Sequence, residues 1–385
     1  MHGLGIRFPW GDPWHKILSL LSCNTRGGLL FPNLKRLIWN ICDNPSGLIF
    51  FRLFLSPQLQ CVTLFSYSEI CGLPPDDIAA LVHMMLFLPP SLERLLVFCG
   101  QRNRELLQNI MSSFVCQRGP SLEGLGTSIP LSEAATLHLM RLPNLSYFNT
   151  SQGPPSNPPA FIFPSLELLH LNHPEALSWV RFLESHEQGG FLIDSALVPR
   201  STNVRDRLKS LKFPEDTIID SRLLSSVVKF RNLVNLRTKT ECPYGEGCLF
   251  PLTDDNIGNL AAELPRLKTL QLGSPCSSNT CKTTITSLMS ISVKCLNLET
   301  LEIHFDTRAI ARDMQRLLSG CTGHEKTKCK LRCLSIWNLP LRANWDECGT
   351  VAKGLKVIFP CLTEMRICKQ ADYIFWRRVQ LRLQE

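Results

Sequence analysis

The sequence contains no apolar run long enough to cross a membrane and no recognisable export signal. No stretch of 18 or more apolar residues without charges occurs in the 385 residues, which argues against an ordinary transmembrane helix. The opening, MHGLGIRFPWGDPWHK, lacks the basic region, the apolar run and the small-residue cleavage site of a secretory signal. We therefore expect a soluble, non-secreted protein in the cytoplasm or the nucleus.

The short motifs that usually mark catalysis are also missing. The sequence has no glycine-rich phosphate loop ending in Gly-Lys, no His-Glu-x-x-His, no nucleophile elbow and no Cys-x-x-Cys pair. Each of these motifs places reactive or ligating groups at a spacing that its chemistry requires. Without them the sequence offers no candidate catalytic or cofactor-binding residue, and we expect a protein that is not an enzyme and carries no cofactor.

Cysteine is numerous but is not distributed as in a disulfide scaffold. The 17 cysteines are only about 4% of the chain and fall mostly within apolar patterns, where a free thiol behaves as a small hydrophobic group. One cluster, Cys321, His324, Cys329 and Cys333, offers four ligands of the kind that zinc prefers. Its spacing matches no established zinc finger, so a polar loop followed by a strand is favoured there over a metal site.

One cadence recurs along nearly the whole chain. In LPRLKTLQLG, FPSLELLHLN and CLNLETLEIH, an anchor leucine is followed by two variable residues, a second leucine, one variable residue and a further apolar residue. Twelve such cadences recur at intervals that centre on about 30 residues, which indicates a repeat architecture. The anchors are Leu34, Leu59, Leu92, Leu122, Leu145, Leu166, Leu208, Leu233, Leu267, Leu298, Leu331 and Leu362.

Each repeat has the pattern of a strand followed by a helix. The apolar residues three and five positions after the anchor alternate with variable ones, which predicts a short strand with one buried face. Between the strands, TDDNIGNLAAEL and LSEAATLHLMRL begin with capping residues, and TRAIARDMQRLLSG ends in glycine. One such unit cannot cover its own apolar face, so neighbouring units must stack. We therefore predict an α/β solenoid with a curved parallel sheet inside and helices outside.

The solenoid is predicted to span residues 25–370 as one array of about twelve irregular repeats. Residues 1–24 are predicted to be an N-terminal remnant or cap. Residues 371–385 are predicted to form a C-terminal capping helix, with Ile374, Phe375 and Val379 facing inward, because a solenoid needs covered ends.

The repeat resembles the leucine-rich repeat, and the particular mixture resembles the F-box and leucine-rich-repeat proteins of mushroom-forming (basidiomycete) fungi. The stretches that carry the resemblance are LLSCNTRGGLLFPNLKRLIWN, FFRLFLSPQLQCVTLF, LPPSLERLLVF, LSEAATLHLMRLPNLSYF and FPSLELLHL. The resemblance implies a non-catalytic protein-interaction scaffold, similar to the part of a cullin-type ubiquitin ligase that recognises the substrate.

The resemblance is incomplete, because the family's F-box is not recognisable here. In that family an N-terminal F-box binds the adaptor subunit of the ligase, and little chain precedes the first anchor in this sequence. The nearest match, LPPDDIAALVHMMLFLPPSLERL, fits the repeat period and is assigned to a repeat helix. We therefore expect no binding to the ligase adaptor.

The predicted partner-binding residues follow from the strand alternation. If the residues at three and five face the helices, those at two, four and six face the concave side. Arginine and aromatic residues are common binding hot spots. The candidates are Arg36, Phe65, Arg94, Phe98, Tyr147, His170, Arg237, Lys239, Glu302, His304, Trp337 and Arg366.

Charge leaves one alternative open. The net charge of +8 arises from 41 basic and 33 acidic residues that are interleaved, whereas a nucleic-acid module usually concentrates its basic residues on one element. Binding of nucleic acid or of another anionic ligand is the alternative to a protein partner. It would use the basic concave residues Arg94, Lys212, Arg237, Lys239 and Arg366.

Overall fold

The computed structural model divides the chain into two compact units. Unit 1 comprises Met1–Asn172 and Gly189–Val204, and unit 2 comprises His173–Gln188 and Arg205–Glu385. The residues that the structure describes are 12–24, 28–40, 45–65, 81–82, 84–99, 104–118, 121–156, 162–172, 176–185, 203–214, 217–238, 251–272, 282–320, 327–336, 345–367 and 373–384.

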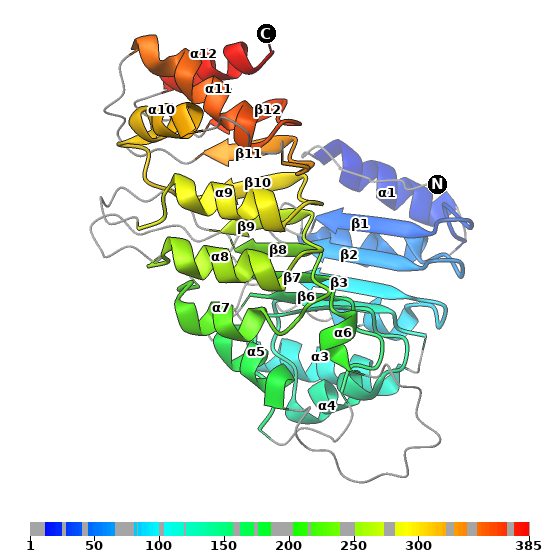
Figure 1. Cartoon of the computed structure of the whole chain (residues 1–385). Helices are drawn as coiled ribbons and strands as arrows, with labels where there is room; N and C mark the ends of the chain where they lie inside the picture. Colours follow the sequence, from blue (N-terminus) through cyan, green and yellow to red (C-terminus); the bar gives the residue numbers. More distant parts are fainter. Residues whose placement is uncertain are drawn as a thin grey trace. The chain divides into compact units, whose positions relative to one another are not determined.

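The described part of unit 1 contains six strands that pair in parallel and in chain order (Figure 1). They are β1 (Arg36–Asn40), β2 (Cys61–Phe65), β3 (Arg94–Phe98), β4 (Gly124–Thr127), β5 (Tyr147–Thr150) and β6 (Leu168–Leu171). The helical elements are α1 (Asp12–Asn24), η1 (Pro45–Phe54), α3 (Arg104–Gln117) and α4 (Glu133–Arg141), and residues 81–82 and 84–87 are also helical.

Unit 2 repeats this arrangement with six further described strands in parallel order. They are β7 (Ser210–Phe213), β8 (Asn235–Thr238), β9 (Thr269–Leu272), β10 (Thr300–Ile303), β11 (Cys333–Ile336) and β12 (Glu364–Ile367). The helices are α5 (Ala176–Ser185), α7 (Ser221–Val227), α8 (Asp254–Glu263), α9 (Ile285–Lys294), α10 (Ile310–Gly320), η2 (Trp345–Glu347), α11 (Cys348–Ile358) and α12 (Tyr373–Gln384). The short helix α6 (Val204–Arg207) begins on the last residue of unit 1, and its other three residues belong to unit 2.

The anchor leucines set the register of the strands in both units. All twelve are buried, and every strand begins two residues after its anchor. Equivalent positions therefore pair across strands: Leu301 lies opposite Leu270 on one side and Leu334 on the other, and all three side chains are fully buried. The predicted repeat spacing and the predicted strands are confirmed.

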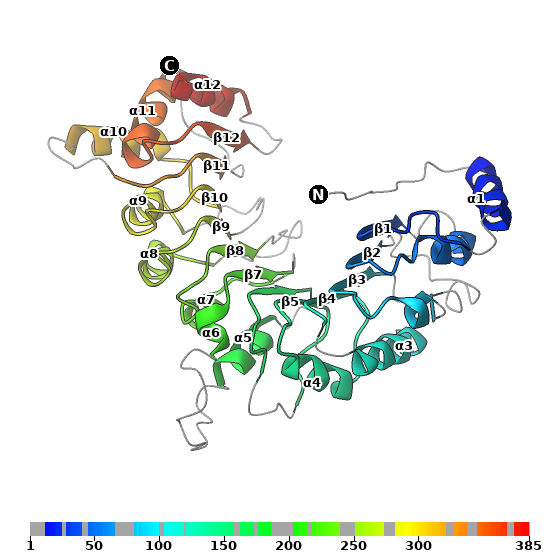
Figure 2. The ribbon, with the colours of Figure 1, turned by 90° about the vertical axis from the view of Figure 1, so that its right-hand side faces the viewer.

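The helices begin and end where local chemistry requires. The side chain of Thr253 accepts a hydrogen bond from the Asn256 backbone N–H, and the Asn256 side chain accepts one from the Thr253 backbone N–H, which forms a capping box before α8. Ser132 caps α4 in a similar way through the N–H of Ala135. The predicted apolar stripe of α8, which includes Ile257 and Leu260, is buried. In each unit the helices cover one face of the sheet (Figure 2), and each unit is an α/β solenoid.

The last helix, α12, packs an aromatic and aliphatic face inward. Phe375, Trp376, Val379 and Leu383 are buried. The prediction that Ile374 faces inward is wrong, because its side chain is 55% exposed. The two residues that follow it, Phe375 and Trp376, form the buried face instead, with their rings packed edge to face. Whether residues 1–24 and 371–385 act as caps stays a prediction.

The described cysteines are all free thiols. Cys329 and Cys333 are buried, and the Sγ of Cys329 donates to the Cys295 carbonyl at 3.5 Å. Burial raises the pKa of both thiols. The other two members of the predicted alternative metal cluster, Cys321 and His324, lie outside the described residues. Across the described ranges, no helix is both long and apolar enough to cross a membrane.

Candidate interaction surface

In each unit the strands leave one face uncovered by helices (Figure 2), and we call it the open face of that unit. Residues three and five positions after an anchor point toward the helices and are buried, whereas those two and four positions after it lie on the open face. The alternation is visible in β2 and β3, where Val62, Leu64, Leu95 and Val97 are buried between partly exposed residues. The open faces correspond to the concave side on which the candidate partner-binding residues were predicted to lie.

Two arginines flank a cysteine on the open face of unit 1. Arg36, Cys61 and Arg94 pair in register on β1, β2 and β3, and both arginines are exposed. Neither guanidinium has an ion pair or hydrogen bond with another residue in the described part of the chain. Burial raises the pKa of the Cys61 thiol, a hydrogen bond with Thr63 and the positive charges of both arginines lower it, and the negative charge of Glu93 raises it. The two guanidinium groups thus act on the same small region.

Phe65 and Phe98 extend this surface toward the carboxyl ends of the strands. Both lie six residues after their anchors, and they pair in register. They remain on the open face because β2 and β3 are five residues long, so the alternation continues to this position. Both side chains are half-buried. With Ile38, which is 44% exposed, and Leu96 they form an apolar area beside the arginines.

Two glycines bring neighbouring side chains together over β4. A Cβ atom on Gly126 would lie 2.8 Å from Leu96 Cδ2 and 3.2 Å from Phe98 Cζ. A Cβ atom on Gly124 would lie 3.2 Å from Arg94 Cγ. The side chains of β3 therefore lean over β4, in the space that larger residues there would occupy.

A polar network covers β5 and β6 in the same unit. The Tyr147 hydroxyl lies 3.4 Å from His170 Nδ1, and the two rings pack edge to face at 5.2 Å. Asn149 Nδ2 donates to the Tyr147 hydroxyl at 3.3 Å, and Asn172 Nδ2 donates to Asn149 Oδ1 at 2.7 Å. Burial raises the pKa of the Tyr147 phenol, while the Asn149 hydrogen bond and the charge of Arg94 lower it. These contacts hold the rings of Tyr147 and His170 in fixed orientations.

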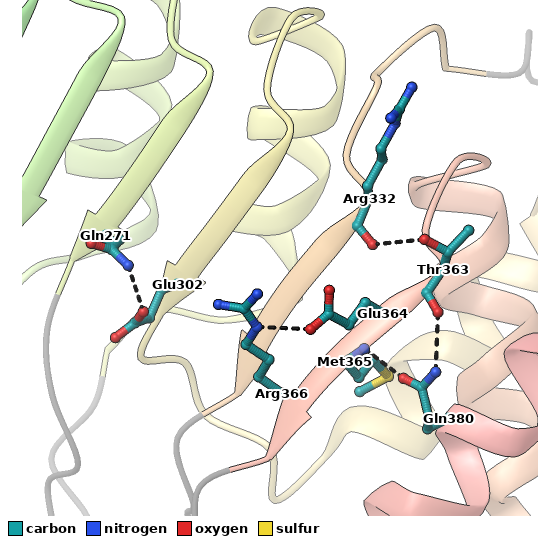
Figure 3. A network of polar contacts seen from close by, with 8 residues as sticks. All are labelled: Gln271, Glu302, Arg332, Thr363, Glu364, Met365, Arg366 and Gln380. Atoms are coloured by element: carbon teal, nitrogen blue, oxygen red, sulfur yellow. Dashed lines mark hydrogen bonds and ion pairs between the residues drawn. The ribbon is translucent and has the colours of Figure 1, made fainter. Parts of the chain in front are cut away.

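The open face of unit 2 carries carboxylates as well as basic side chains. Gln271 Nε2 donates to the Glu302 carboxylate at 2.9 Å, and Arg366 Nε donates to the Glu364 carboxylate at 2.8 Å (Figure 3). Glu302 has the predicted position on the open face, but its side chain is only 7% exposed, because it is engaged by its neighbours on the sheet. Arg237 is exposed.

The prediction that His304 lies on the concave surface is wrong. Its side chain is fully buried, and burial lowers its pKa to about 4. Its carbonyl accepts a hydrogen bond from Thr283 Oγ1 at 2.5 Å. The physical reason is the length of β10, which ends at Ile303. The alternation of side chains stops with the strand, so it does not extend to the sixth position here as it does at Phe65 and Phe98.

Two further candidates, Lys239 and Trp337, lie outside the described residues. The register rule would also have included Ile38, Leu96 and Asn149, but the selection by arginine, aromatic and charged type passed over them. The sequence could not indicate that Gly124 and Gly126 leave room for neighbouring side chains, because that depends on which residues the strand beside them places there. No group of three or more metal-ligating side chains occurs among the described residues.

Comparisons with known proteins leave the family unassigned. No family model matches the sequence, and no curated protein matches it significantly. Among solved structures, a chain in the crystal structure of the Rad7 and Elc1 complex in yeast is similar to this one. It shares 17% of residues, with a TM-score of 0.36, over 91% of this chain and 75% of that chain. The solenoid fold rests on the register and helix order described above.

Proposed function

We propose that this protein is a non-catalytic scaffold that binds a protein partner through the open faces of its sheets. The observation that supports the proposal most directly is the regular presentation of arginine and aromatic side chains on a face that no helix covers. On unit 1 these are Arg36, Arg94, Phe65, Phe98 and Tyr147. Such residues often supply about 2 kcal/mol or more each to binding when a partner covers them.

The scaffold is rigid where it would contact a partner. Backbone hydrogen bonds to both neighbouring strands hold each interior strand, and the buried leucine rows fix the spacing of its side chains. A partner would therefore meet side chains whose positions are set before it binds, which reduces the entropy that binding must overcome. The proposed role is binding alone and requires no catalytic step.

The cellular context of the proposal comes from the sequence. The resemblance of the repeats to F-box and leucine-rich-repeat proteins supports a role in recognising a ubiquitin-ligase substrate, in the cytoplasm or the nucleus. Co-purification of a ligase adaptor would decide whether this chain works with a ligase. We expect none, since no F-box is recognisable in the sequence.

Site-specific photo-crosslinking tests the binding surface. A photoreactive amino acid placed at Arg94 or Arg237 samples the two open faces, and one placed at Arg104 or Arg266 samples exposed positions away from them. We expect adducts with the same protein partner from the open-face positions, and none from the control positions. Adducts that form only at Arg104 or Arg266 would move the binding surface off the open faces and contradict the proposal.

Salt dependence separates this proposal from nucleic-acid binding. Phosphate contacts release counterions, so affinity for nucleic acid falls steeply as salt concentration rises. An interface anchored by aromatic side chains loses much less. A partner whose capture resists a rise from low to physiological salt therefore supports a protein interface.

A further inference from the structure

The open face of unit 1 differs from that of unit 2 in its charge. Its described strand positions include no aspartate or glutamate, whereas unit 2 places Glu302 and Glu364 on its open face. The residues on the open face of unit 1 are Arg36, Ile38, Cys61, Thr63, Phe65, Arg94, Leu96, Phe98, Gly124, Gly126, Tyr147, Asn149, Leu168 and His170. The described strand positions of this face are therefore basic and partly apolar, and none of them carries a carboxylate.

The nearest carboxylates do not neutralise the two arginines. Glu93 and Glu123 lie one position after their anchors, at the start of the strands and outside the open-face rows. Glu93 accepts a hydrogen bond from Gln60 Nε2 at 3.1 Å. Neither carboxylate forms an ion pair with Arg36 or Arg94 among the described residues, so both guanidinium groups can accept an external carboxylate.

The open face of unit 1 has room for one extended peptide segment. Six strands at about 4.8 Å spacing and four residues at about 3.3 Å each give a sheet face of roughly 24 by 13 Å. One extended segment would cover it.

The spacing of the arginines suggests how such a segment would carry its charges. Arg36 and Arg94 occupy the same register position two strands apart, which corresponds to about 9.6 Å. In a polyproline II segment, residues three apart lie on the same side and about 9.3 Å from each other. Cys61, between the arginines, is too short to block a chain that runs across the strands.

We propose that the open face of unit 1 binds an acidic peptide segment that crosses the strands. Carboxylates three residues apart pair with Arg36 and Arg94, and an apolar side chain of the segment packs on Leu96 and Phe98. Arginine is suited to this contact because its planar guanidinium donates two parallel hydrogen bonds to one carboxylate. The inference rests on the proposed function and specifies the chemistry of the partner.

Synthetic peptides test this inference directly on the full chain. The probe is a fluorescein-labelled peptide with glutamate at every third position and leucine between, and its binding is followed by fluorescence anisotropy. Two companion peptides carry glutamine or lysine in place of glutamate. We expect the glutamate peptide to bind at least about tenfold more tightly than the glutamine peptide, and the lysine peptide not to bind.

Matched variants separate a specific contact from general attraction to a basic protein. The Arg36→Ala/Arg94→Ala pair should weaken the glutamate peptide at least about tenfold. The Arg104→Ala/Arg141→Ala pair removes the same charge from exposed helix positions on unit 1, so it should bind like the wild type. Arg36→Lys/Arg94→Lys keeps the charge but loses the bidentate geometry, and we expect an intermediate affinity. Circular dichroism of each variant reports whether the fold is retained.

Several results would overturn the inference. Equal affinity for the glutamate and glutamine peptides, or equal loss in both alanine pairs, would show that Arg36 and Arg94 do not select an acidic ligand. Arginine-dependent binding of a single-stranded oligonucleotide without peptide binding would assign the face to nucleic acid. If crosslinking from Arg94 captures a protein while the peptide does not bind, the proposed function stands and the acidic chemistry fails.

Discussion

The side chain of Gln380 covers the free edge of strand β12, and its removal should expose backbone groups of that strand. Among the described strands, β12 pairs with β11 alone. On the other side, the Met365 N–H donates to Gln380 Oε1, and Gln380 Nε2 donates to the Thr363 carbonyl at 3.1 Å (Figure 3). An amide side chain from α12 thus occupies the hydrogen-bonding positions of a further strand, which protects an edge that could otherwise pair with another chain.

Gln380→Ala removes both of these hydrogen bonds. Met365 is a buried residue at 7% exposed, so its N–H loses a partner at a site with little access to water. Leaving a buried donor unsatisfied costs about 1–3 kcal/mol, and each 1.4 kcal/mol corresponds to about a tenfold change in equilibrium. We therefore expect the Met365 amide to exchange with deuterium at least about fivefold faster in the variant, measured by hydrogen-exchange mass spectrometry or NMR.

Two further variants make this test specific. Gln384→Ala changes an exposed residue at the end of the same helix and should leave Met365 exchange unchanged. Gln380→Glu keeps the acceptor for Met365 but, when ionised, cannot donate to the Thr363 carbonyl. Protonation near the usual glutamate pKa of about 4.3 restores the donor. The difference in Met365 exchange rate between Gln380→Glu and the wild type should therefore shrink as pH falls. Unchanged exchange at Met365 in Gln380→Ala would refute the edge-closing role.

Three other perturbations test the packing, the buried histidine and the open face. Leu301→Ala should lower the free energy of unfolding of unit 2 by about 2–5 kcal/mol, because a fully buried leucine between Leu270 and Leu334 leaves a cavity; urea denaturation measures it, Thr269→Ser is the control, and a loss below about half a kcal/mol would contradict the register. The pKa of His304 is lowered to about 4 by burial, so the unfolded chain binds the proton more readily. The free energy of unfolding is therefore unaffected by His304 above the unfolded pKa of about 6.5. It falls as pH drops from there toward about 4, by up to about 3 kcal/mol. His304→Gln should flatten the pH dependence in that window, and an identical pH profile would show that His304 is not its source. Gly126→Ala should displace Leu96 and Phe98, whose flexible ends lie within 2.8 and 3.2 Å of the new Cβ; we expect a melting temperature close to the wild type but weaker binding of the acidic peptide, and unchanged binding would remove Leu96 and Phe98 from the contact.

The sequence alone determined the positions of the strands and the start of several helices. A leucine at each anchor must be buried, and the two leucines or equivalents that follow it must face the same side, so the strand starts two residues later in every repeat. The capping residues Thr253 and Ser132 act on backbone groups within three residues of themselves. Such signals are local, and the physical chemistry that they report does not depend on distant parts of the chain.

Tertiary structure decided which candidate residues reach the open faces. His304 is buried because β10 ends at Ile303, the residue before it. Glu302 is covered because Gln271 of the neighbouring strand donates a hydrogen bond to its carboxylate. Ile374 is exposed while Trp376 is buried, because the orientation of α12 depends on the surface that it packs against. Gly124 and Gly126 matter only through side chains of the strands beside them, and Gln380 only through the edge of β12. Each of these outcomes depends on contacts between residues distant in sequence, and neither composition nor periodicity encodes which side chain will occupy the space next to another strand.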